Sequence, residues 1–170
     1  MLSGLSCGQS RSPARTVFIR DVVQYLKQKQ LNQIGHKFEN NWRSKTLENL
    51  EKEYWDEPTY NSHLVISCHG LRKKPLEGFT VEDLRIMIGQ NIGLKYLIPL
   101  ALEKLNEDVL AEGDLFEGDL LNSVLTRDKG FWRNENDLFN SLEDIISKNE
   151  NKLKDQQPKL LDAFYELKRE

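Results

Sequence analysis

The side chains best suited to metal binding or nucleophilic chemistry are two thiols and three imidazoles. They are Cys7, Cys68, His36, His63 and His69. Zinc sites draw on closely spaced Cys and His pairs, and the sequence has neither C-x-x-C nor H-E-x-x-H. A cysteine nucleophile needs a base, and no local signature supports such a pair. We therefore expect no catalytic residue, no metal site and no cofactor, and we interpret Cys68 as a buried structural cysteine on a helix face.

Carboxylates are a second source of chemistry. Glu112, Asp114 and Asp119 could act as general acid and base if they converged in one deep pocket. The segment from Gly89 to Gly93 is rich in glycine, but it lacks the G-x-x-x-x-G-K-[ST] pattern of a phosphate-binding loop. None of these signals favours an enzyme.

The elements that position these residues are predicted to be helices. A loose tail over residues 1–15 precedes an amphipathic helix that carries Phe18, Val22, Tyr25 and Leu26. Ser44 and Ser62 are candidate N-caps of the next two helices, and the second should stop before Pro75.

The predicted core lies in the middle of the chain. Thr80 and Asp83 resemble a capping box at the start of a helix, which Gly89 and Gly93 then interrupt. The clearest helical periodicity runs from Leu94 to Leu105, where Pro99 must kink the helix or lie in its first turn. Further helices are predicted in three places, with Asp119 as a candidate cap of the first: Leu120–Leu125, Leu138–Ile146 and a segment starting near Pro158.

Because no alternating strand pattern stands out, the sequence predicts an all-α fold. We expect a single-domain bundle of about six to eight helices with irregular connections over residues 16–170. No run approaches the roughly 18 apolar residues of a membrane span, and two cysteines fit a reducing compartment. The expected location is the cytoplasm, with no membrane partner.

Charge is distributed unevenly along the 170 residues. The chain has 24 Lys and Arg against 27 Asp and Glu, a net charge of -3, which excludes a uniformly basic nucleic-acid binder. Residues 1–43 nevertheless hold seven bases and two acids, whereas residues 103–119 hold seven acids and one base. The acidic segment is either a solvated surface or a site for an electropositive partner.

Several motifs in the middle of the chain resemble one family when they are taken in order. They include Cys68-His-Gly-Leu-Arg72, Asp83-Leu-Arg-Ile-Met-Ile-Gly-Gln-Asn-Ile-Gly-Leu94, Leu110-Ala-Glu-Gly-Asp114 and Gly118-Asp-Leu-Leu121. Over about residues 44–126 the sequence resembles the immunity proteins of bacterial contact-dependent growth inhibition (CDI) systems. The flanks, residues 1–43 and 127–170, have no secure match.

The resemblance implies a non-enzymatic antidote that binds the C-terminal toxin domain of a cognate CDI effector and neutralises it. Many such toxins are nucleases with basic substrate-binding surfaces, so the acidic segment would take the place of phosphate and occlude the toxin's active or substrate-binding surface. The predicted acidic contacts are Glu107, Asp108, Glu112, Asp114, Glu117 and Asp119. The predicted aromatic anchors are Trp55, Tyr60, Phe116 and Trp132, with Phe131 as a further candidate, although all five could equally belong to the core.

Two other functions remain as alternatives. A small helical nucleic-acid-binding regulator would use the basic N-terminal helix around Arg20, Lys27 and Lys29. An acid–base enzyme would use the three carboxylates described above. The hypothesis that the chain is an immunity protein predicts no direct contact with nucleic acid, and it leaves the oligomeric state open.

Overall fold

The computed structural model describes residue 38, residues 40–58 and residues 62–169. This part of the chain contains nine α-helices and no β-strand, which confirms the predicted all-α class. The predicted tail and the predicted helix from Phe18 to Leu26 lie outside the described residues and stay predictions. The helices are α2 (Leu47–Glu51), α3 (His63–Arg72), α4 (Val81–Gly89), α5 (Leu94–Glu107), α6 (Asp119–Leu125), α7 (Lys129–Asn134), α8 (Asn136–Lys148), α9 (Glu150–Gln156) and α10 (Pro158–Lys168).

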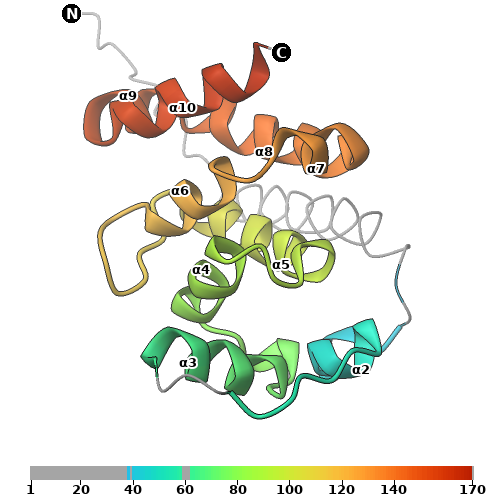
Figure 1. Ribbon diagram of the computed structural model, residues 1–170. Coiled ribbons are helices and arrows are strands. Elements are labelled where there is room, and N and C mark those ends of the chain that lie inside the picture. The colour runs from blue at the N-terminus through green and yellow to red at the C-terminus, as the bar shows by residue number, and fades with distance from the viewer. Residues whose placement is uncertain (1–37, 39, 59–61, 170) are drawn as a thin grey trace, which may run out of the picture. The chain divides into compact units, whose positions relative to one another are not determined.

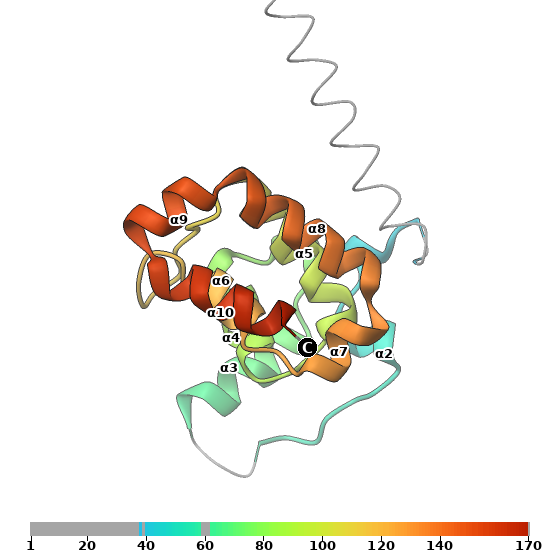
Figure 2. The same ribbon diagram turned by 90° about the horizontal axis from the view of Figure 1, so that it is seen from above.

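The core is built on three central helices. α4, α5 and α6 pack against one another, and α5 also packs against α8 while α10 packs against α6 and α9. In Figure 1 these three helices lie between α2 and α3 on one side and α7–α10 on the other, and Figure 2 shows the same elements from above. Most of the fully buried side chains in the centre are at the predicted helical spacing, while Ile92 is half-buried and Met87 is buried without having been predicted. Those at the predicted spacing are Leu84, Ile88, Leu97, Ile98, Ala101, Leu105, Leu120, Leu121 and Val124.

Local signals set the ends of the two longest central elements. Thr80 and Asp83 form the predicted capping box at the start of α4. α4 ends at Gly89, and α5 begins after Gly93, whose φ of +65° lies in the left-handed region that favours glycine. α5 continues through Pro99, which is therefore inside the helix and beyond its first turn.

Three predicted caps differ from the structure, and one of them is Ser62, which occupies the N-cap position of α3 but makes no side-chain capping hydrogen bond. Thr46, rather than Ser44, caps α2, because its hydroxyl accepts a hydrogen bond from the Asn49 N–H at 3.2 Å, whereas Ser44 lies in the short 3-10 turn before it. Gly118 occupies the N-cap position of α6, and Asp119 is the first residue inside that helix. The Asp119 side chain is thereby free to bond to the preceding loop.

Two short helices, α7 and α9, were not anticipated from the sequence. Each buries one side chain, Trp132 in α7 and Leu153 in α9, so neither produces a periodic apolar pattern. Among the described helices, none is long and apolar enough to cross a membrane.

Candidate functional site

The acidic loop, residues 108–118, joins α5 to α6 and returns close to its starting point. The Gly118 N–H donates to the Leu110 carbonyl at 3.1 Å, which closes the loop on itself. Val109 and Leu110 are buried at its base. The loop projects beside α4 and α6 in Figure 1, in the manner of compact surface loops whose ends meet.

The Asp119 carboxylate holds the loop from below. It accepts the N–H of Gly113 at 2.7 Å and the N–H of Leu115 at 3.1 Å. Asp119 is only 2% exposed, and the Arg85 Nε lies 3.6 Å from its Oδ2. The carboxylate therefore satisfies backbone donors of the loop instead of facing solvent.

A second carboxylate holds the loop from α4. Glu82 Oε2 accepts the N–H of Asp114 at 2.9 Å, and the same side chain forms a bidentate pair with Arg85, at 2.6 Å for both hydrogen bonds. The hydrogen bond from Arg85 lowers the pKa of the Glu82 carboxyl, and the pKa of the Arg85 guanidinium is raised in turn. Arg85 thus orients both of the carboxylates that fix the loop.

Glycine is required at two positions of the loop. A Cβ on Gly113 would lie 2.5 Å from Glu82 Oε2 and 3.0 Å from Asp119 Oδ2, so the supporting carboxylates leave no room for a side chain. Gly118 has a φ of +89°, and a Cβ there would lie 2.8 Å from Leu160 Cδ1 of α10. The C-terminal helices add one further support, since Gln157 Nε2 donates to the Glu117 carbonyl at 2.9 Å.

The braced loop presents an apolar pair surrounded by acids. Leu115 is 63% exposed and Phe116 is 42% exposed. Glu112, Asp114 and Glu117 on either side are also exposed. Large apolar side chains on a surface, rimmed by charged groups, are typical of sites that bind another protein.

Glu107 and Asp108, at the end of α5, are exposed but partly neutralised. Lys152 lies 2.9 Å from Asp108 Oδ1, and this hydrogen bond, together with one from the Leu110 N–H, lowers the pKa of the Asp108 carboxyl. Glu107 has Lys104 at 3.8 Å. These two acids therefore contribute less net charge to the surface than the three at the tip of the loop.

Trp55 lies in another part of the fold. It is half-buried in the segment after α2, where its ring lies against the Arg72 guanidinium at 4.3 Å and meets His69 edge-on at 5.1 Å. Arg72 is itself buried and pairs with Glu51 at 2.6 Å. Trp55 therefore covers a buried cation. Tyr60 lies outside the described residues.

Trp132 is 4% exposed, in contact with Phe131 and Phe139 at ring distances of 5.2 Å and 5.8 Å. It belongs to the packing of α7 against α8, and Phe131 is half-buried beside it. Of the predicted anchors in the described residues, Phe116 alone lies among the exposed acids. Leu115 was missed, although its position between two acids and next to Phe116 is a usable signal.

The supporting residues Glu82 and Arg85 were also missed. Their i, i+3 spacing on a helix indicates an ion pair, but no pattern connects them to a loop about thirty residues later.

The geometry of the loop disfavours the acid–base alternative, because Asp119 is buried below the loop whereas Glu112 and Asp114 are exposed. These three carboxylates do not share one environment. No group of His, Cys, Asp and Glu among the described residues is arranged to hold a metal ion, and burial raises the pKa of the Cys68 thiol.

A family model for CDI immunity proteins matches residues 49–142 of the chain, more than half of its length. This protein belongs to the CDI immunity proteins. The match extends from α2 into α8 and includes the whole acidic loop and its supports on α4, while α9 and α10 lie beyond it. No curated protein and no solved structure shows a significant match.

Membership gives the chain an immunity role and suggests that it acts without catalysis. A CDI immunity protein has a cognate toxin as its partner.

Proposed function

We propose that this CDI immunity protein neutralises the C-terminal toxin domain of its cognate effector by binding it through the acidic loop. The observation that carries the proposal is the exposed pair Leu115 and Phe116, presented among three exposed acids on a loop whose backbone N–H groups donate to the Asp119 and Glu82 carboxylates. The proposed site of action is the cytoplasm of the protected cell, and the proposed effect is occlusion of the toxin's active or substrate-binding surface.

The apolar pair supplies the anchor of the proposed interface. A few well-buried large side chains account for most of the binding energy of protein complexes, and surrounding groups mainly exclude water. Phe116 and Leu115 are already exposed and can enter a pocket on the toxin without any rearrangement of the core. Because the loop is fixed in the free protein, little conformational entropy is lost when it binds.

In this proposal the exposed acids of the loop attract the toxin electrostatically as the two proteins approach each other. Glu112, Asp114 and Glu117 are exposed, and none of the ion pairs identified in the described residues involves them. We propose that the toxin is a nuclease, whose phosphate-binding surface is positive and is attracted to this cluster. Such complementarity raises association rates more than it raises affinity, and it weakens as salt is added.

Asp119 and Trp132 do not belong to the proposed contact surface, because both are buried. Trp55 is also left out, since it packs on Arg72 in a different segment. Glu107 and Asp108 form the edge of the surface, where their pairing with lysines limits their contribution.

Co-purification with the toxin domain encoded beside this gene tests the proposal. A stable complex at micromolar concentration is the expected result, and we expect it to bury about 1,200–2,000 Å² in total. Reversing the charge of Glu112, Asp114 and Glu117 together should slow association and remove most of its salt dependence. An association rate that does not respond to this change would show that the acids are only a solvated surface.

A further inference from the structure

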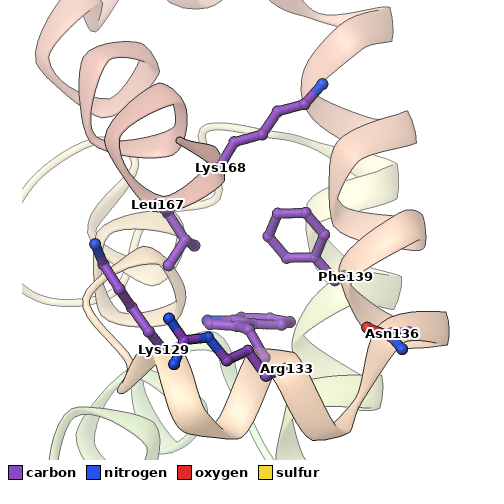
Figure 3. Close-up of a pocket in the computed structure, with 7 residues that line it drawn as sticks. Lys129, Arg133, Asn136, Phe139, Leu167 and Lys168 are labelled. Carbon is purple, nitrogen blue, oxygen red and sulfur yellow. The ribbon is translucent and has the colours of Figure 1, made fainter. Parts of the chain in front are cut away.

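A pocket with a different character lies between α7, α8 and α10. Its volume is about 160 Å³. A cavity of roughly 150 Å³ accepts one benzene molecule, so this pocket has room for a single aromatic or branched aliphatic side chain. In Figure 3, Leu167 of α10 and Phe139 of α8 face each other across it.

The lining combines apolar walls with a cationic rim. Trp132, Phe139 and Leu167 provide the apolar surface. Lys129 and Arg133 of α7 and Lys168 of α10 also line the pocket, and no carboxylate is among the lining residues; in Figure 3 the Lys168 ammonium points away from Phe139 and Leu167. Lys168 also pairs with Glu143, which lies outside the lining. The complementary occupant is an apolar side chain that is flanked by acids.

The chain itself carries such a group on a different part of its surface. Phe116 and Leu115 are exposed on the acidic loop before α6, and Glu112, Asp114 and Glu117 flank them. The loop is held in place by Glu82 and Asp119, so it needs no ordering before it can be inserted. We propose that the acidic loop of one copy of this protein docks Phe116 into the α7–α8–α10 pocket of a second copy.

Such a contact is head-to-tail, because the two surfaces that meet are different. The pair as a whole keeps one unused pocket, on one copy, and one unused loop, on the other, and further copies can add until the arrangement closes into a ring. A contact centred on one side chain is smaller than a standard interface of about 1,600 Å². Self-association is therefore weak, needs high protein concentration and decreases with salt.

The proposal does not depend on toxin binding, and its test uses the immunity protein alone. Sedimentation velocity of the full chain over a wide range of concentrations should show an average mass that rises above the monomer's 19.8 kDa at low salt and returns towards it at high salt. A mass that stays at that of the monomer at every concentration would overturn the proposal.

Two single-surface variants identify the contact. Phe116→Ser removes the inserted side chain, whereas Arg133→Glu reverses the pocket rim, and each variant alone should remain monomeric. Mixed together, they should form a one-to-one dimer and nothing larger, because the mixture contains one intact loop and one intact pocket per pair. Self-association that persists in either variant alone, or a mixture that stays monomeric, would contradict the proposal.

A third variant tests whether self-association depends on filling the pocket and not on the charge of its rim alone. Leu167→Trp fills the pocket without a change of charge and should abolish self-association as Arg133→Glu does. Tyr54→Ser, an exposed aromatic change in the segment after α2, is the matched control and should self-associate like the wild type. Far-UV circular dichroism and a thermal unfolding curve establish that each variant is folded before its mass is compared.

Discussion

Asp119 accepts the backbone N–H of Gly113 at 2.7 Å, so the first residue of α6 fixes the middle of the loop that precedes it. This relationship gives the most acidic segment of the sequence a defined conformation. Asp119, one of the seven acids of that segment, is buried as a support, Glu103 is half-buried and pairs with Arg43, and the other five are exposed. The acidic loop of this protein is therefore an ordered surface with exposed apolar residues at its centre.

Replacing Asp119 should destabilise the protein. Asp119→Ala leaves two backbone donors without their acceptor and removes one of the two carboxylates beside Arg85, and we expect the free energy of unfolding to fall by about 3 kcal/mol. Asp119→Asn keeps the shape and one acceptor oxygen, so it should cost about half as much. Urea denaturation measures both. Asp114→Ala, an exposed acid on the same loop, is the control and should stay within about 0.5 kcal/mol of the wild type. Equal stability of all variants would contradict the supporting role.

Gly118 and Gly70 should respond in opposite directions to the same substitution. Gly118→Ala forces a Cβ into a left-handed conformation 2.8 Å from Leu160, and we expect a loss of about 1–2 kcal/mol. Gly70→Ala lies in α3, where a Cβ meets nothing within 4 Å, and should stabilise the protein by about 0.5–1 kcal/mol. Thermal unfolding of the two variants gives the comparison. A Gly118→Ala variant that is as stable as the wild type, or more stable, would show that backbone conformation at Gly118 is not restricted.

Stability should decrease in acid through Glu82. Its pKa is lowered in the folded protein by the hydrogen bond from Arg85, relative to an ordinary value of 4.5. The ionised carboxylate therefore stabilises the fold at pH values above the unfolded-state pKa, and this contribution is lost as the pH falls through the lower folded-state pKa. Urea midpoints at neutral pH and in the acid range should differ less in Glu82→Gln than in the wild type. An unchanged difference would mean that Glu82 does not contribute.

Arg72 should be important for the segment that carries Trp55. Its guanidinium pairs with Glu51 at 2.6 Å, donates to the Glu53 carbonyl at 2.8 Å and lies against the Trp55 ring. Arg72→Met should cost about 2–3 kcal/mol, since it removes a buried cation with several partners. It should also shift tryptophan fluorescence to longer wavelength as Trp55 becomes more solvated. Lys73→Met, at the exposed neighbouring position, should change neither quantity, and a similar effect of both substitutions would contradict this account.

The helices were predictable where apolar residues repeat with helical spacing. Leu84 and Ile88 of α4, and Leu97, Ala101 and Leu105 of α5, are buried as their spacing requires. The short helices α7 and α9 were not predictable, because a helix of one or two turns that buries a single residue has no repeating apolar pattern to detect.

The candidate site was predictable only in part. Charge counting located the acidic segment and Phe116 within it. The supporting role of Asp119 depends on its contacts with Gly113 and Arg85, and Arg85 reaches it through the tertiary fold and not through a local motif. For the same reason the sequence could not separate Phe116 from Trp132, since an aromatic residue in a short polar segment has the same local context whether it faces the core or the solvent.

The affinity of the Phe116→Ala variant for the cognate toxin domain, measured by calorimetry, is the most direct test of the central claim. We predict a loss of at least about 2 kcal/mol, which is roughly thirtyfold in the dissociation constant, because an exposed aromatic anchor is removed from a preformed loop. Tyr54→Ala, which removes a comparably exposed aromatic side chain outside the loop, should bind like the wild type. Wild-type affinity in Phe116→Ala, with a folded protein and an intact toxin, would contradict the assignment of the acidic loop as the toxin-binding surface.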